Sequence, residues 1–84
     1  MANTTTINSP VSVTAFAFGR NMSAYPRRIE YNGATYSFID AGVRMVVSTG
    51  GKIAQIMTMS DGRRDFHLRS DNNGGSWTLL SISQ

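Results

Sequence analysis

The dipeptide Asn32-Gly33 separates two stretches of alternating apolar and polar residues, "RRIEY" and "ATYSF". Both central residues of a type I′ turn need a positive φ angle, which Asn and Gly tolerate better than other residues. Ile29 and Tyr31 share one face of the first stretch, and two aromatic residues continue an apolar face on the second. The sequence therefore predicts a β-hairpin over residues 27–38.

Turn signals of the same kind divide the rest of the chain. They are Gly50-Gly51, the "SDGR" stretch at 60–63 and the "DNNGG" stretch at 71–75. The segments between them, "KIAQIMTM", "RDFHLRS" and "SWTLLSIS", alternate as strands do. Short strands separated by turns are typical of antiparallel β proteins. We predict a mainly β fold, a small antiparallel meander of five to six strands that curls into a barrel or a bent sheet.

The segment that precedes Gly50 fits two interpretations. Val43, Val46 and Val47 lie at helical spacing, and Asp40 is able to cap a short helix. In a strand, Val43, Met45 and Val47 would instead share one face. The sequence leaves both open and allows at most one short helix near 41–49.

The first predicted strand, "VSVTAFAF" at 11–18, has apolar residues on both faces. Val11 and Val13 point one way, while Phe16 and Phe18 point the other. A strand of this kind either lies in the middle of a sheet or is covered by another chain. The polar residues before it predict a flexible N-terminal tail over 1–9, followed by a single small β domain over 10–84.

Several classes of protein are disfavoured by composition. The chain has no cysteine, which excludes disulfides, thiolate metal sites and thiol catalysis. No basic residue precedes Arg20, and no continuous apolar core follows the N-terminus as it does in a signal peptide. No stretch approaches the ~20 apolar residues of a membrane span. We therefore expect a cytoplasmic protein without a membrane partner.

Residues that could carry catalysis are few. The single histidine, His67, shares a predicted strand face with Asp65, but no serine near it has the setting of a nucleophile. Metal-ligand spacings and phosphate-binding glycine motifs are absent from the sequence. We expect a non-catalytic protein with no metal site, no cofactor and no small-molecule substrate.

Single-stranded nucleic acid, or another polyanion, is one possible partner. The net charge is +3, with seven Arg and one Lys. Arginines that hold phosphates beside aromatic rings that stack on bases would bind such a strand. The candidate rings are Tyr25, Tyr31, Tyr36, Phe38 and Trp77. However, a small core needs its aromatics, and neighbouring residues on a strand face opposite ways.

Another protein, including a second copy of this chain, is the preferred partner. The two-faced strand 11–18 and the methionines Met45, Met57 and Met59 present more apolar surface than one small core needs. We expect a homo-oligomer in which residues 11–18 supply a sheet edge. Across both hypotheses the candidate partner-binding residues are Phe16, Phe18, Arg27, Arg28, Arg63, Arg64 and Arg69.

Overall fold

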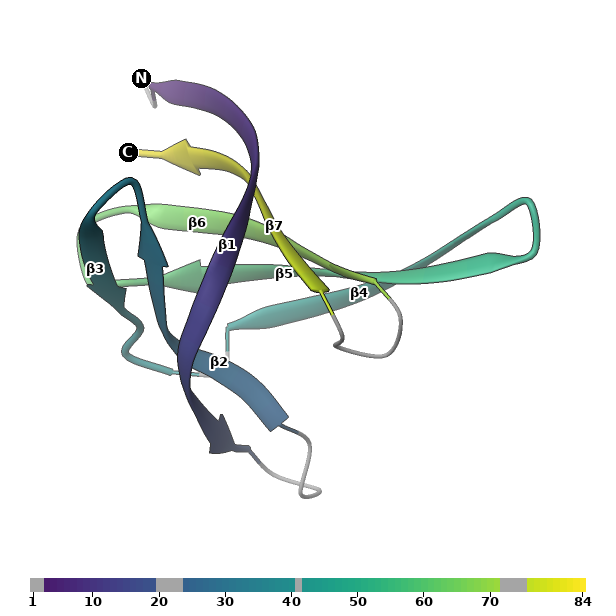
Figure 1. Ribbon diagram of the computed structural model, residues 1–84, viewed down its shortest axis with the longest axis horizontal. Helices are drawn as coiled ribbons and strands as arrows, with labels where there is room; N and C mark the ends of the chain where they lie inside the picture. Colours follow the sequence, from purple (N-terminus) through teal and green to yellow (C-terminus); the bar gives the residue numbers. More distant parts are fainter. Residues whose placement is uncertain (1–2, 20–23, 41, 72–75) are drawn as a thin grey trace.

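The computed structural model describes residues 3–19, 24–40, 42–71 and 76–84. These ranges contain seven strands in one antiparallel sheet and no helix. The strands are β1 (Thr4–Phe18), β2 (Ala24–Tyr31), β3 (Ala34–Ser37), β4 (Val43–Thr49), β5 (Lys52–Ser60), β6 (Asp65–Asp71) and β7 (Ser76–Ser83). Their order in the sheet is β3-β2-β1-β7-β6-β5-β4, so β3 and β4 are the two edges (Figure 1). The predicted mainly β fold is confirmed as a bent sheet, with seven strands in place of five to six.

The sheet bends along its longest strand, β1. Residues 4–11 of β1 pair with β7, whereas residues 12–18 pair with β2. An extra residue interrupts the first pairing between Thr6 and Ser9, where Asn8 has a φ angle of 52°. Further register shifts follow between Val13 and Phe16. Extra residues of this kind bend a strand and increase its twist, so β1 carries β2 and β3 over the face of β5, β6 and β7.

The position of β1 confirms one expectation and corrects two. The two-faced strand lies between β2 and β7, as a central strand should. The sheet edge expected from residues 11–18 is wrong, because β1 is long enough to pass through both halves of the sheet and leaves the edges to β3 and β4. The tail expected over 1–9 is also shorter, because β1 begins at Thr4 opposite Ser83. Three consecutive threonines favour this early start.

The turn signals produce the predicted hairpins. Asn32 and Gly33 have φ angles of 53° and 80° and join β2 to β3 with Tyr31 opposite Ala34. Gly50 and Gly51, also at positive φ, join β4 to β5. Most of the predicted "DNNGG" turn lies outside the described residues.

The ambiguous segment before Gly50 is a strand, and the helix near 41–49 is not formed. Each of the seven residues of β4 has a partner on β5, from Val43 opposite Thr58 to Thr49 opposite Lys52. The segment is rich in β-branched residues, which lose side-chain freedom in a helix and fit a pleated sheet well. Pairing along the whole of β5 therefore outweighs the helical spacing of the valines.

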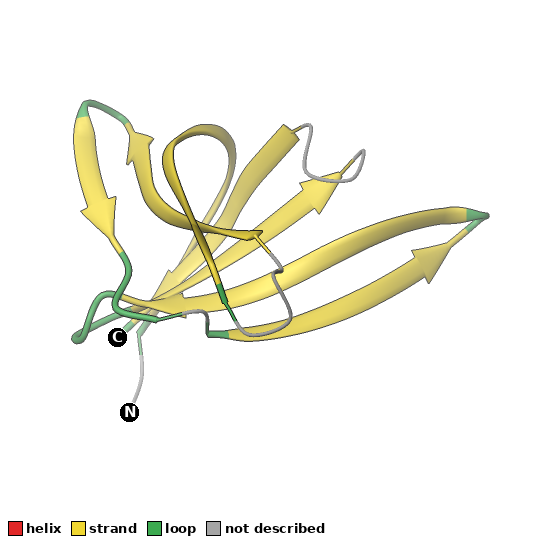
Figure 2. Ribbon diagram, turned by 90° about the horizontal axis from the view of Figure 1, so that it is seen from below, coloured by secondary structure: helices red, strands yellow, loops and turns green. Residues whose placement is uncertain are grey.

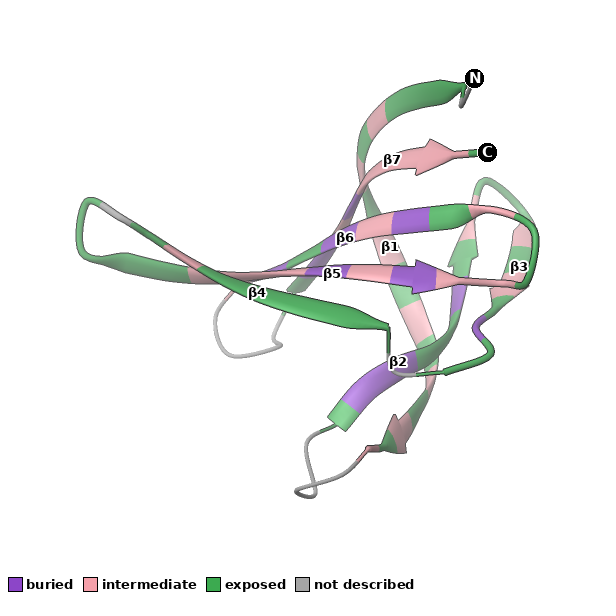
Figure 3. Ribbon diagram, turned by 180° about the vertical axis from the view of Figure 1, so that it is seen from behind, coloured by how far each residue is buried: buried purple, intermediate pink, exposed green. Residues whose placement is uncertain are grey.

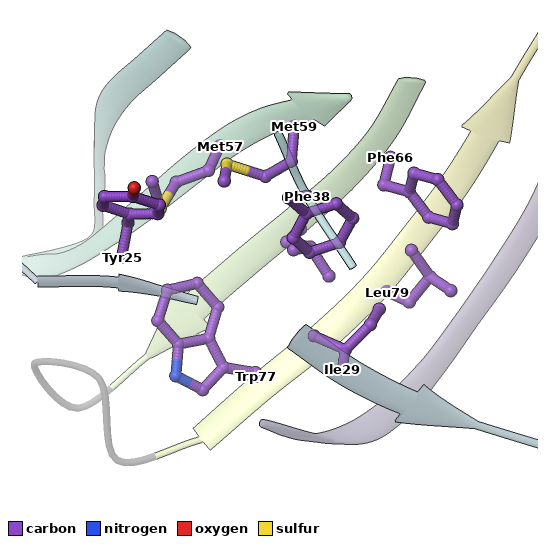
Figure 4. Close-up of a cluster of buried hydrophobic side chains, with 9 residues drawn as sticks. Tyr25, Ile29, Phe38, Met57, Met59, Phe66, Trp77 and Leu79 are labelled. Carbon is purple, nitrogen blue, oxygen red and sulfur yellow. The ribbon is translucent and has the colours of Figure 1, made fainter. Parts of the chain in front are cut away.

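The core lies between the two halves of the bent sheet (Figure 4). Phe66 is central to it: its ring centroid lies 5.2 Å from that of Phe38 and 5.1 Å from that of Tyr36. Two backbone hydrogen bonds attach the chain after β3, from Phe38 N–H to the Arg27 carbonyl and from Ile39 N–H to the Ser60 carbonyl. The buried apolar residues are Tyr25, Ile29, Phe38, Met57, Met59, Phe66, Leu68, Trp77 and Leu79.

Two glycines provide a matched test of the backbone. Gly33 and Gly42 both have positive φ, which strains any other residue by about 1 kcal/mol or more. A Cβ on Gly33 would meet open space, whereas one on Gly42 would collide with the carbonyl oxygen of Thr58 on β5. We predict that Gly42→Ala lowers the melting temperature clearly more than Gly33→Ala does. Equal melting temperatures in thermal unfolding would show that Gly42 does not approach β5 this closely.

Trp77 provides a second test, this time of the core. Its side chain is 9% exposed, and nothing in the described part of the chain accepts a hydrogen bond from its Nε1–H. Trp77→Ala should cost roughly 3–5 kcal/mol because it leaves a large cavity. Trp77→Phe should cost far less, because it removes a buried donor that has no partner. Urea unfolding followed by circular dichroism measures both, and similar losses would reveal an acceptor for Nε1–H.

Candidate functional site

The hairpin formed by β4 and β5 projects from the body of the molecule (Figures 1 and 2). β6 pairs with β5 only from Gln55 to Ser60, so residues 52–54 of β5 extend beyond it. There their only strand partner among the described residues is β4. The outer half of this hairpin therefore lies beyond the part of the sheet that the core covers.

Much of this hairpin is exposed (Figure 3), and large apolar residues are among its exposed positions. Their exposed fractions are 71% for Val43, 57% for Met45, 62% for Val46 and 66% for Ile53. Cross-strand partners share a face. Met45 therefore lies on the same face as Ile56, while Val46 lies opposite Gln55 on the face that Met57 turns to the core. Both faces of β4 thus present apolar groups to solvent.

The free edge of β4 lacks the usual protection against pairing. Sheet edges are normally blunted by short strands, Pro, Lys or bulges. The other edge, β3, is only four residues long. β4 has seven residues, no Pro, Lys or acidic residue, and an uninterrupted register with β5. Its single charge is Arg44, whose guanidinium donates to the Ala24 carbonyl at 2.8 Å and holds the start of β4 against β2.

The candidate residues Phe16 and Phe18 are exposed, at 52% and 68% respectively. The Phe16 ring lies 6.5 Å from that of Trp77, at the border of the core. Both belong to β1, which lies between β2 and β7. Their backbone groups are therefore not free to pair with another strand, whereas those on the outer edge of β4 are. Sequence reasoning missed Val43, Val46 and Ile53 as surface residues. The signal available in the sequence is the excess of apolar residues in "VRMVV". It indicates an apolar surface only if the segment is a strand, and the sequence also allows a helix there.

The Arg63-Arg64 pair lies in a tight turn built on Asp61. The Asp61 carboxylate accepts hydrogen bonds from the backbone N–H groups of Arg63 and Arg64, at 2.9 and 2.8 Å. It also pairs with the Arg64 guanidinium at 3.0 Å. Arg64 in turn lies over the rings of Tyr36 and Phe66, 5.3 and 5.4 Å from their centroids. The Arg64 guanidinium therefore makes its contacts within the fold, with Asp61, Tyr36 and Phe66.

The other candidate arginines differ in whether they form an ion pair. Arg69 forms an ion pair with Asp71 at 3.1 Å. Arg27, Arg28 and Arg63 are exposed, and the described residues give none of them an ion pair. Arg63 and Arg64 line an open cavity of about 290 Å³ together with Gln84. No contact brings Arg27 or Arg28 to this cavity, so the described residues do not form one continuous site from the two pairs.

The predicted base-stacking rings do not form an open platform. Tyr25, Phe38 and Trp77 are buried in the core. Tyr31 and Tyr36 are half-buried and pack against it. These rings therefore stabilise the fold through their burial, in line with the alternative interpretation that a small core needs its aromatic residues.

His67 takes part in a polar network across the solvent-facing side of the sheet. Its Nδ1 lies 3.2 Å from Thr58 Oγ1 and its Nε2 lies 3.3 Å from Ser83 Oγ. The Ser83 hydroxyl also contacts Thr4 Oγ1 at 3.1 Å. Asp65 makes no hydrogen bond to His67 among the described residues. A serine beside a histidine acts as a nucleophile only with a group that orients the histidine, usually a carboxylate, and with an oxyanion site. Here Thr58 occupies the position of that carboxylate, which fits a structural hydrogen-bond network.

Comparison with protein-family models, with curated proteins and with solved structures gave no match to this chain. Over the ranges that the structure describes, no helix is long and apolar enough to cross a membrane. In the same ranges, no group of three or more His, Asp or Glu side chains could hold a metal ion.

The Asp61 turn makes a prediction about pH. Burial raises the pKa of the Asp61 carboxyl, but hydrogen bonds from Arg64 and Arg63 and the Arg64 charge outweigh it, so the pKa lies below its ordinary value of 3.8. The folded state then binds this proton more weakly than the unfolded state. The stabilisation is complete above pH 3.8 and is lost as pH falls through the lowered pKa.

We therefore expect Asp61→Asn to be less stable than the unmodified chain at neutral pH, with a difference that shrinks below pH 3.8. Urea unfolding across this pH range measures the free energy of unfolding of both proteins. A difference that stays constant down to the lowest pH would contradict the ion pair with Arg64.

Proposed function

We propose that this chain is a non-catalytic protein-binding module, and that its binding surface is the exposed edge of β4. The observation that carries the proposal is a regular seven-residue edge strand with apolar side chains exposed on both faces. An extended partner segment that adds to such an edge gains main-chain hydrogen bonds, and alternate side chains supply specificity. The partner is thus a polypeptide that offers a strand of its own.

The apolar side chains of the hairpin are large enough to matter for affinity. Full burial of one such side chain contributes about 1.5–3 kcal/mol. Val43, Met45 and Val46 are each more than half exposed, so covering them recovers much of this contribution. Association itself costs about 4–15 kcal/mol. The free energy gained from burying these side chains does not exceed the cost of association by a wide margin, and neither does the free energy gained from main-chain hydrogen bonds. Binding should therefore require both kinds of contact.

Nucleic-acid binding is supported by the exposed Arg27, Arg28 and Arg63 and by the net charge of +3. It lacks the stacking surface on which single-strand binding depends, because the predicted rings are buried or half-buried. Arg64 and Arg69 already pair with carboxylates. Charge alone discriminates weakly between partners, and the protein-binding edge is the more specific feature.

The test compares lysine substitutions on the two sheet edges. Val46→Lys places a charge in the middle of β4, and Thr35→Lys places one at an exposed position on β3. Each tagged protein is incubated with nuclease-treated lysate of the source organism and, separately, with an untagged copy of the chain. We predict that the unmodified protein and Thr35→Lys retain the same discrete protein, and that Val46→Lys loses it at least about tenfold, a difference of about 1.4 kcal/mol.

Both positions are exposed, so both variants should keep nearly the same melting temperature. A parallel incubation uses untreated lysate, and retention that occurs only there and survives Val46→Lys would favour nucleic acid instead. A protein retained equally by all three chains would show that β4 is not the binding surface.

A further inference from the structure

We propose that the strand paired with β4 is the β4 of a second copy, antiparallel to the first, with a two-fold axis at Val46. This inference rests on the proposed function, because it names the partner of the same edge. A two-fold contact is attractive for an open edge because one surface satisfies both copies. The result would be one continuous sheet through two molecules.

Symmetry allows only a few registers. A two-fold axis perpendicular to the sheet keeps each face of the sheet on its own side. Since side chains alternate between faces, one residue must then lie opposite its own copy. A register centred on Arg44 would place two guanidinium groups together, and like charges directly opposite are unfavourable. Registers centred on Met45 or Val47 pair only residues 43–47 or 45–49, whereas the one centred on Val46 pairs all of β4, residues 43–49.

The side chains of β4 agree with this register. Val46 lies against its own copy at the axis, on the face that Met57 shares. On the other face Met45 lies opposite Val47 of the second copy. Arg44 lies opposite Ser48, so the only charge of the strand meets a small polar residue. Val46 and the two Met45–Val47 pairs thus bring apolar residues together, Val43 lies opposite Thr49, and no like charges face each other.

Charges at the ends of the hairpin add complementarity. In this register the tip of one hairpin, where exposed Lys52 begins β5, comes beside the segment that precedes β4 in the second copy. Asp40 is exposed in that segment and accepts a hydrogen bond from Gly42 N–H at 2.8 Å. Opposite charges are therefore present at both ends of the contact, with Lys52 one strand away from the second copy because it pairs with Thr49 across the hairpin. The hairpin projects from the body (Figures 1 and 2), which keeps the two bodies at opposite ends of the paired strands.

Because the chain contains no cysteine, single cysteine substitutions report the register directly. Directly opposite residues of an antiparallel pair have Cα atoms about 4.5–5.5 Å apart, which a disulfide can bridge. Under mild oxidation we expect V46C to form a covalent dimer with itself. S48C and R44C, on the same face of β4, should each stay monomeric alone. An equimolar mixture of S48C and R44C should form the mixed dimer.

Light scattering of the unmodified protein and of Val46→Lys accompanies the crosslinking. We expect a dimer mass for the unmodified chain across micromolar concentrations and a monomer mass for the variant. Equal crosslinking of V46C, S48C and R44C alone would overturn the register. A monomeric unmodified chain, with no crosslink through V46C, would overturn the self-pairing.

The two proposals fail in different ways. If the unmodified chain is monomeric and another protein still binds in a Val46-dependent manner, the second copy is wrong while the β4 edge stands. If Val46→Lys changes neither the mass nor the retention of any protein, both proposals are wrong.

Discussion

The bend in β1 is the constraint on which the rest of this structure depends. A flat seven-stranded sheet would expose both faces, and a chain of this size has no helix to cover either of them in its described residues. By pairing first with β7 and then with β2, β1 folds the sheet over itself and creates one inside face. Asn8, at positive φ, inserts the extra residue at the start of this path. The nine buried residues of the hydrophobic core, which come from both halves, pack together only because of this bend.

The same bend limits how much of the sheet can be covered. The β2–β3 half is short. The chain after β3 is attached to the middle of β2 through Phe38 and to the end of β5, next to the Asp61 turn, through Ile39. Met57 and Met59 lie beneath it and are buried, while Ile53, further along the same strand, is 66% exposed. The outer half of the β4–β5 hairpin is therefore uncovered because of the geometry of the sheet. It includes the apolar residues Val47, Ile53 and Ala54, and β6 pairs with β5 only from Gln55 onward.

Sequence reasoning predicted the local features and missed those that depend on distant pairing. Asn32-Gly33 and Gly50-Gly51 marked turns because positive φ is a local requirement. The strands β6 and β7 follow from the alternation of "RDFHLRS" and "SWTLLSIS", which is also a local pattern. The strand order, and so the identity of the edge, depends on β1 meeting the far end of the chain at β7, which no local pattern encodes. That is why the sequence predicts an edge at residues 11–18, which include Phe16 and Phe18, and not at Val46.

The contrast between the two edges is the strongest guide to function. β3 is short, and the chain that follows it is fixed to β5 by the Ile39 N–H to Ser60 hydrogen bond, so little of its edge is available. β4 is nearly twice as long, regular and apolar, and Arg44 fixes its start so that the strand keeps one orientation. For an isolated monomer this is a hazard, because such edges recruit other chains without selection. A long, regular and apolar edge opposite a blunted one suits the strand-pairing interface proposed above, since the partner would meet a backbone that is already extended.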